Sequence, residues 1–332
     1  MQRCTRFFGK ICSMTFKNDF GQGQGRRAQT SSGSGRAGGG GIPIAVGGGG
    51  IGTIILLAIV FFLNGGLGGL TGGSSDPQGQ SQQSPGAQGD YDLSHCDAPG
   101  AANEYDDCRA EATARSVDQV WAEVLPAQAN IEYTPADINL FRSDVSTGCG
   151  YATADTGPFY CPNDTTAYLD VSFFEQLGQL GGSNGALSQE YVTAHEMGHH
   201  IQNLEGTLGL SDYKNPGEDS AAVAIELQAD CYAGIWAKHA SEGPDAALEP
   251  ITDEQLNQAI QTAQAIGDDS IQRKSGGDVD PDSWTHGSSE QRAEAFKSGY
   301  TTGQMSACDT LNRGVYPVSY THLRAHETKA NL

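Results

Sequence analysis

The stretch "YVTAHEMGHHIQ", Tyr191 to Gln202, places three of the chain's eight histidines and a glutamate within six residues. Around it, residues 189–204 contain no proline and a single glycine, Gly198. Ser188 is a suitable N-cap, and Gly206 stands where a glycine favours the end of a helix. We therefore predict a helix of about four turns, with two of the histidines in its apolar stripe.

The spacing within this helix is that of a metal motif, H-E-x-x-H. His195 and His199 are one turn apart, so both imidazoles can bind one zinc ion. Glu196 follows the first histidine, where its carboxylate can accept a proton from a metal-activated water. His200 points about 100° away and is expected to pack or to support the site. The structural alternative is a helix with solvated histidines that binds no metal.

A catalytic zinc ion needs a third protein ligand and one open position. The sequence "AIELQADCYAGIW", residues 224–236, belongs to a second, alanine-rich helix that can start at a Ser220 N-cap. Glu226 can supply a carboxylate to the metal, and Asp230, one turn further, can accept the outer N–H of a ligand histidine. Glu205, which stands where a metzincin would have a histidine, is an alternative ligand. A charged pair on a solvated helix face is the structural alternative for Glu226 and Asp230.

The first quarter of the chain differs from the rest in composition. Residues 21–41 and 67–89 are rich in Gly, Ser and Gln and predict flexible linkers. Between them, residues 42–63 carry no charge and are long enough to span a bilayer, so we expect an anchor that binds the lipid bilayer. A cleaved signal peptide, which would leave the protein secreted, is the alternative.

The charges set the expected topology. Seven basic residues and one acidic residue precede the apolar segment, which places the N-terminus in the cytoplasm and the rest outside the cell membrane. The remaining 12 basic and 39 acidic residues then lie outside, and this excess of acidic residues, which gives the whole chain its net charge of -21, argues against nucleic acid as a partner. We expect a basic, Gly-rich cytoplasmic segment (1–41), a transmembrane anchor (42–63), a linker (64–94), a folded domain (95–317) and a tail (318–332). The tail resembles a translated sequencing adapter, so its histidines, His322 and His326, are left out of the site.

The cysteines indicate an oxidising compartment. An even number lies beyond the apolar segment, which predicts disulfides. Two pairs close short loops and leave the third by elimination, although about 15 pairings are open to six cysteines. The expected pairs are Cys96–Cys108, Cys149–Cys161 and Cys231–Cys308.

The motifs "AHEMGHHIQ" (194–202) and "ELQADCYAGIW" (226–236) together resemble the bacterial neutral zinc metallopeptidase family, which is gluzincin-like. Further similar stretches are "GCGYATADTGPFYCP" (148–162), "YLDVSFF" (168–174), "AIGDD" (265–269) and "VDPDSWTHGSSEQR" (279–292). The resemblance covers about residues 90–316 and implies that the folded domain is a zinc metallopeptidase domain. It implies one catalytic zinc ion bound by His195, His199 and Glu226, with Glu196 as general base and Asp230 behind a ligand histidine.

The same resemblance assigns a role to His286 in "SWTHGSS", which stands just before an expected helix N-terminus. It would stabilise the oxyanion of the reaction, and a structural loop histidine is the alternative.

The expected fold class is α+β, a mainly helical zincin-like domain with a small sheet, preceded by one transmembrane helix. The sequence pattern predicts strands at 138–142 and 167–171 and further helices at 105–125, 220–239, 252–266 and 288–297. Thr252 and Gln255 form an expected capping box, and Gly299 an expected helix end.

The expected function is a zinc-dependent endopeptidase that hydrolyses extracytoplasmic proteins or peptides. A substrate backbone would pair with an edge strand. The alternatives are an inactive, zinc-bearing cell-envelope binding protein and a metal-dependent amidase acting on peptidoglycan.

Overall fold

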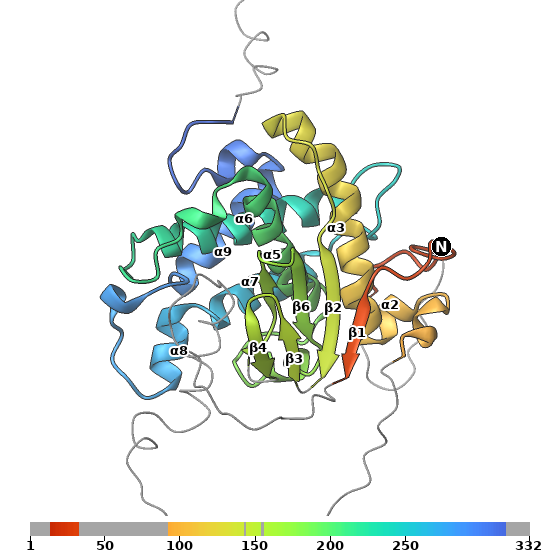
Figure 1. The fold of residues 1–332 in the computed structure, drawn as a ribbon, viewed down its shortest axis with the longest axis horizontal. Coiled ribbons are helices and arrows are strands. Elements are labelled where there is room, and N and C mark those ends of the chain that lie inside the picture. Colours follow the sequence, from red (N-terminus) through yellow and green to blue (C-terminus); the bar gives the residue numbers. More distant parts are fainter. Residues whose placement is uncertain (1–13, 33–91, 143, 154–155, 317–332) are drawn as a thin grey trace, which may run out of the picture.

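The computed structural model describes residues 14–32, 92–142, 144–153 and 156–316 of the chain. A small sheet lies among long helices, as Figure 1 shows. This mainly helical α+β arrangement agrees with the expectation for the domain. The helices are α2 (Ala101–Glu104), α3 (Asp106–Ala129), α4 (Phe173–Gln176), α5 (Ala186–Glu205), α6 (Ala221–Ser241), α7 (Asp253–Ala265), α8 (Asp268–Lys274) and α9 (Ser289–Thr302).

The sheet of the described residues has the strand order β1-β2-β6-β5. Its strands are β1 (Gln29–Ser32), β2 (Asp137–Arg142), β5 (Phe159–Cys161) and β6 (Thr166–Asp170). β2 and β6 confirm the strands predicted at 138–142 and 167–171, whereas β1 and β5 were not predicted. β1, β2 and β6 are parallel, whereas the edge strand β5 is antiparallel to β6. A separate hairpin joins β3 (Asp144–Thr147) to β4 (Gly150–Thr153).

Most of the predicted helix caps are present in the structure. The Ser220 hydroxyl accepts a hydrogen bond from the Val223 N–H, and Thr252 forms its capping box with Gln255. Gly206 ends α5 at a φ of 71°. The prediction for Ser188 is wrong, because α5 begins two residues earlier and this side chain is fully buried inside the helix.

The start of α9 has a capping box as well, since Ser288 accepts from the Gln291 N–H. Gly299 is not a helix end, because α9 continues to Thr302 and Gly303 caps it at a φ of 65°. A β-carbon on Gly299 would lie 1.9 Å from the Cys231 carbonyl oxygen of α6. Glycine is therefore needed here for the close packing of α9 against α6.

The N-terminal segment, residues 14–32, belongs to the folded domain. β1 pairs with β2 from Gln29↔Asn139 to Ser32↔Arg142, and Phe16 is buried and forms a bridge with Leu248. Phe16 is buried in the core by contacts with residues far away in the sequence, and the composition of the surrounding segment does not reveal such contacts. The predicted linker from residue 21 and the predicted domain boundary at residue 95 are therefore wrong for this segment.

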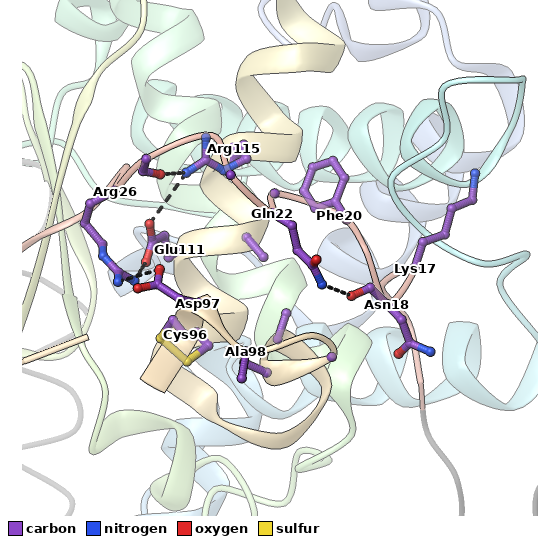
Figure 2. A pocket seen from close by; sticks show the side chains of 18 residues that line it. Lys17, Asn18, Phe20, Gln22, Arg26, Cys96, Asp97, Ala98, Glu111 and Arg115 are labelled. Carbon is purple, nitrogen blue, oxygen red and sulfur yellow. Dashed lines mark hydrogen bonds and ion pairs between the residues drawn. A yellow bond between two sulfur atoms is a disulfide. The ribbon is translucent and has the colours of Figure 1, made fainter. Parts of the chain in front are cut away.

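Two arginines attach this segment to acidic side chains of α3. Arg27 donates to both carboxylate oxygens of Asp118, at 2.6 and 3.2 Å. Arg26 donates to Glu111 and to Asp97, as Figure 2 shows beside the disulfide at Cys96. Because these ion pairs join residues some 70 to 90 positions apart, the basic residues of the segment contribute to the tertiary structure.

The expected membrane segment, residues 42–63, lies outside the described residues. Within the described ranges, no helix has both the length and the apolar character that crossing a bilayer requires. The transmembrane helix in the expected fold class is therefore not supported. In addition, β1 and β2 share one sheet, so residues 29–32 and 137–142 lie in the same compartment. Residues 29–32 of the expected cytoplasmic segment are thus part of the folded domain, while the expected localisation of that domain stays a prediction.

The disulfides have the predicted connectivity. Cys96 bonds to Cys108, Cys149 to Cys161, and Cys231 to Cys308, with Cα–Cα distances of 5.1, 5.8 and 5.5 Å. The last pair joins α6 to the short turn η6 (Met305–Cys308), 77 residues apart in the sequence. Cys4, Cys12 and the histidines of the tail lie outside the described residues.

Helix α6 lies between α5 and α9, and this layer of three helices positions the candidate site. Gly198 of α5 faces Ala229 of α6, and a β-carbon there would lie 3.1 Å from the Ala229 carbonyl oxygen. The glycine between the motif histidines thus lets α6 approach the metal helix closely.

Candidate metal centre

The predicted ligands come together where α5 faces α6. His195 Nε2 lies 3.2 Å from Glu226 Oε2, and His199 Nε2 lies 3.7 Å from Glu226 Oε1. One ligand atom from each of the three residues lies within 4.8 Å of the others. Ligands about 2.0–2.2 Å from a tetrahedral zinc ion are spaced by roughly 3.3 Å, so this donor set fits zinc.

The side chains of the three candidate ligands are buried. His195 is 3% exposed, His199 2% and Glu226 1%. Tyr213 donates a hydrogen bond to Glu226 Oε1 at 3.1 Å. Burying two imidazoles and a carboxylate together is costly unless a cation or a proton joins them, which is what a metal site requires.

Asp230 lies behind His195, as predicted. His195 Nδ1 donates to Asp230 Oδ1 at 2.7 Å, which directs Nε2 of the same ring toward Glu226. Arg292 of α9 donates to both oxygens of Asp230, at 2.8 and 3.0 Å, and Tyr191 also donates to this carboxylate. Asp230 is thus held as an ion although it is fully buried.

In the protein without metal, these neighbouring charges shift the pKa values of His195, Asp230 and Glu226. Burial disfavours the charged form of His195, but Asp230 and Glu226 outweigh it and raise the pKa of the ring to about 10. Burial likewise opposes ionisation of Asp230, yet Arg292 and His195 lower the pKa of this carboxyl to about 2. The pKa of Glu226 is also lowered, because the histidine charges outweigh its burial.

His199 has a different environment from His195. Its Nδ1 donates to the side-chain oxygen of Gln202 at 2.8 Å, a neutral partner. Burial lowers the pKa of His199 to about 4, so this ring is neutral over the ordinary pH range. Its unprotonated Nε2 is therefore available to a metal.

Glu196 lies next to this group and is 3% exposed. Burial, assisted by the negative charge of Glu226, raises the pKa of Glu196 to about 7. A carboxyl group with this pKa can accept and release a proton near neutral pH.

His286 is buried on the loop before α9, with 2% exposure. Its Nδ1 lies 3.1 Å from Asp268 Oδ1, while no described residue bonds to its Nε2. The other oxygen of Asp268 accepts the backbone N–H groups of Thr285, His286 and Gly287. The charges of His286 and of Glu196 and Glu226 influence one another, so the ring belongs to the same electrostatic environment.

Other candidate ligands lie elsewhere. His200 packs between Tyr160, whose hydroxyl is 3.0 Å from Nδ1, and the Thr134 carbonyl oxygen at 2.6 Å. Glu205 accepts hydrogen bonds from Tyr232 and Tyr316 and is not in the metal group. A second group that could hold a metal consists of His95, Cys96, Asp107 and Cys108, but its two cysteines form a disulfide.

Several residues of the site were missing from the sequence prediction. Arg292, Gln202, Asp268 and Tyr213 each contact a predicted site residue. Arg292 ends the motif "VDPDSWTHGSSEQR" and Asp268 lies in "AIGDD", so their place in similar stretches was a signal. Their partners become visible only once α5, α6, α8 and α9 are packed together.

The fold and the site define a class of protein: α+β proteins with an H-E-x-x-H helix that faces an acidic candidate ligand on the next long helix. The chain belongs to the family described as "Putative neutral zinc metallopeptidase", whose model matches residues 14–311. The match begins at the N-terminal segment that packs into the domain.

Similar proteins occur in mycobacteria and in Escherichia coli. The uncharacterized protein Mb2605 of Mycobacterium bovis is 46% identical over 228 residues, which are 67% of this chain and 76% of that protein. The uncharacterized protein Rv2575 of Mycobacterium tuberculosis matches to the same extent. The uncharacterized protein YpfJ of Escherichia coli K12 is 39% identical over 191 residues, which are 55% of this chain and 64% of that protein. No solved structure matches the chain significantly.

Proposed function

We propose that this protein is a zinc-dependent endopeptidase that acts in an oxidising compartment. The observation that carries the proposal is the buried group of His195, His199 and Glu226, with Glu196 beside it. A purely structural zinc site closes its fourth position with a protein ligand and needs no base. A buried glutamate with a raised pKa next to three ligands therefore favours hydrolysis over the inactive, zinc-bearing alternative.

When zinc is bound by these residues, it supplies a Lewis acid that polarises the scissile carbonyl and lowers the pKa of the attacking water. Glu196 accepts the proton of that water and then delivers it to the leaving amine. A pKa of about 7 suits both transfers, because the same carboxyl must gain and lose a proton in each turnover.

His286 is proposed to stabilise negative charge on the carbonyl oxygen during attack. Asp268 orients the ring through Nδ1 and fixes the loop through backbone hydrogen bonds, which leaves Nε2 to donate. Asp268 also outweighs the burial of His286 and raises its pKa, so a second proton on this ring is favoured. Preorganised donors of this kind contribute to the rate when they meet the developing oxyanion.

The substrate is proposed to be an extended peptide that pairs with the edge strand β5. This strand ends the sheet order and is antiparallel to β6, so one side of its backbone is not used by another strand of the sheet. The Tyr160 hydroxyl of β5 contacts His200 of the metal helix, which places this edge close to α5. Pairing through the backbone would hold peptides of many sequences.

The proposed place of action is outside the cytoplasm, and three disulfides among the described residues support it. Such bonds persist in oxidising compartments. The substrates would then be extracytoplasmic proteins or peptides.

The test is Glu196→Gln in the full chain, assayed for cleavage of casein and for zinc content. We expect about one zinc ion per chain, as in the unchanged protein, and a loss of turnover of several orders of magnitude. Glu190→Gln is the matched control, because Glu190 is equally buried on α5 but bonds to Thr15, and it should cleave casein normally. Full activity of Glu196→Gln would disprove the assignment, and cleavage of purified peptidoglycan but not casein would indicate the amidase.

A further inference from the structure

A chain of side-chain amides leads from the metal centre to a disulfide. Gln202 accepts from His199 Nδ1 through its oxygen, and its nitrogen donates to the Ile225 carbonyl at 2.7 Å and to Gln228 Oε1 at 3.1 Å. Gln228 in turn donates to the Cys308 carbonyl at 3.1 Å and to the Tyr316 hydroxyl at 3.2 Å.

Every polar atom of these two amides has a defined direction. Because the nitrogen of Gln202 faces two oxygens, its own oxygen must face His199, and an amide oxygen can only accept. His199 therefore carries its proton on Nδ1 and keeps Nε2 free toward Glu226. Gln202 and Gln228 are both fully buried, so water cannot replace a lost partner without cost.

The far end of the chain is fixed covalently. Cys308, whose carbonyl receives the Gln228 amide, is bonded to Cys231 of α6. Gln228 stands on the same helix, three residues before Cys231. The disulfide thus holds the acceptor carbonyl of Cys308 against the helix that carries both Gln228 and Glu226.

We propose that Gln202 and Gln228 are positioning residues that fix the tautomer and orientation of His199, with the Cys231–Cys308 disulfide as their anchor. This inference rests on the proposed function, because it takes His199 as a metal ligand. The two motif histidines are then oriented in different ways. His195 is oriented by a buried ion pair, and His199 by the two neutral amides of Gln202 and Gln228, which we call the amide relay.

The relay makes a prediction that a merely structural role does not. If Gln228 acts on the metal only through Gln202, the effects of the two residues on zinc affinity cannot be additive. Partners behind a metal ligand are worth about 10- to 100-fold in affinity. Gln202→Met should therefore weaken zinc binding at least about tenfold, and Gln228→Met should weaken it by a smaller factor. The double variant should bind zinc no more weakly than Gln202→Met alone.

The experiment measures the zinc dissociation constant of each full-length variant against a chromophoric chelator. It also records the visible spectrum of the cobalt-substituted protein, which reports the geometry of the ligands independently of activity. Gln189→Met is the matched control, since Gln189 is buried on the same helix and bonds to Arg109 instead. It should change neither zinc affinity nor the cobalt spectrum. The double substitution Cys231→Ala/Cys308→Ala removes the disulfide and should weaken zinc binding when Gln228 is present. In the Gln228→Met background, the same double substitution should not weaken zinc binding further.

The outcomes separate the two proposals. Zinc affinity within twofold of the unchanged protein in both Gln202→Met and Gln228→Met, or additive effects in the double variant, would overturn the relay and leave the proposed function intact. An unchanged protein that binds no zinc would overturn both. If Gln228→Met does not fold, Gln228→Glu keeps an acceptor for Gln202 but cannot donate to Cys308, and it should still weaken zinc binding. Unchanged affinity of that variant would likewise overturn the relay.

Discussion

Arg292 and Asp230 form a buried ion pair in which Arg292 Nε and Nη2 donate to the two carboxylate oxygens, at 2.8 and 3.0 Å. The same carboxylate accepts His195 Nδ1 at 2.7 Å. Helix α9, which carries no predicted metal ligand, therefore controls the orientation of a ligand on α5 through a residue on α6.

Replacing Arg292 by Met should destabilise the protein strongly, because it leaves the Asp230 carboxylate buried without its cation. We expect a decrease in the free energy of unfolding of roughly 3–5 kcal/mol, measured by urea denaturation. Arg273→Met is the control, since the Arg273 side chain is largely exposed and its partner Asp269 keeps its hydrogen bonds from Ser289, so this change should cost less than about 1 kcal/mol. Equal losses of unfolding free energy in the two variants would show that the buried ion pair stabilises the protein no more than the exposed one.

Zinc binding should release a proton from His195. With a pKa of about 10 in the protein without metal, this ring is protonated at neutral pH, whereas His199 with a pKa of about 4 is not. Zinc affinity should therefore rise about tenfold per pH unit between roughly pH 7 and 9 and level off above the pKa of His195. Calorimetry in buffers of different ionisation enthalpy would count the released protons.

Asp230→Asn provides the control for this titration. It removes the negative charge that raises the pKa of His195 but keeps an oxygen that can accept from Nδ1. Proton release near neutral pH should decrease in this variant. A zinc affinity that does not change with pH in the unchanged protein would contradict the assignment of a charged His195.

His286→Ala should reduce kcat about 100-fold and leave zinc content and KM nearly unchanged, because its proposed hydrogen bond forms with the developing oxyanion. His239→Ala is a suitable comparison, since this histidine of α6 contacts the Gly303 carbonyl and is not part of the metal group. It should retain normal kcat. If His286→Ala instead raises only KM, the ring binds substrate and does not stabilise the transition state.

Gly299→Ala should separate α9 from α6, because its new β-carbon would overlap the Cys231 carbonyl. We expect a loss of about 3 kcal/mol in the free energy of unfolding and weaker zinc binding, as Arg292 moves away from Asp230. Gly209→Ala has nothing within 4 Å of the new atom and should change stability by no more than about 0.5 kcal/mol. A stable Gly299→Ala protein with normal zinc affinity would show that the helices tolerate the shift.

The parts of the molecule that local sequence determines were predicted well. Helix α5 and its metal motif depend on side chains one turn apart, and the caps at Ser220 and Thr252 on residues three apart. The parts that depend on distant partners were not. Gly299 reads as a helix end from its neighbours alone, yet its role is set by Cys231 on another helix.

The N-terminal segment shows the same limit most clearly. Its glycines, glutamines and serines predict a linker, because few apolar side chains are present. Its order in the fold comes from Arg26 and Arg27, whose acidic partners lie far along the chain, and from the backbone of β1. Composition counts residues but does not locate their partners.

The pairing of β1 with β2 also determines what a proteolytic cut would do. The disulfides of the described residues do not join residues 14–32 to the rest, so a nick between residues 33 and 91 would convert the chain into a two-piece complex. The small piece would remain bound through β1, Phe16 and the two arginines, and its release on dilution would remove one edge strand of the sheet.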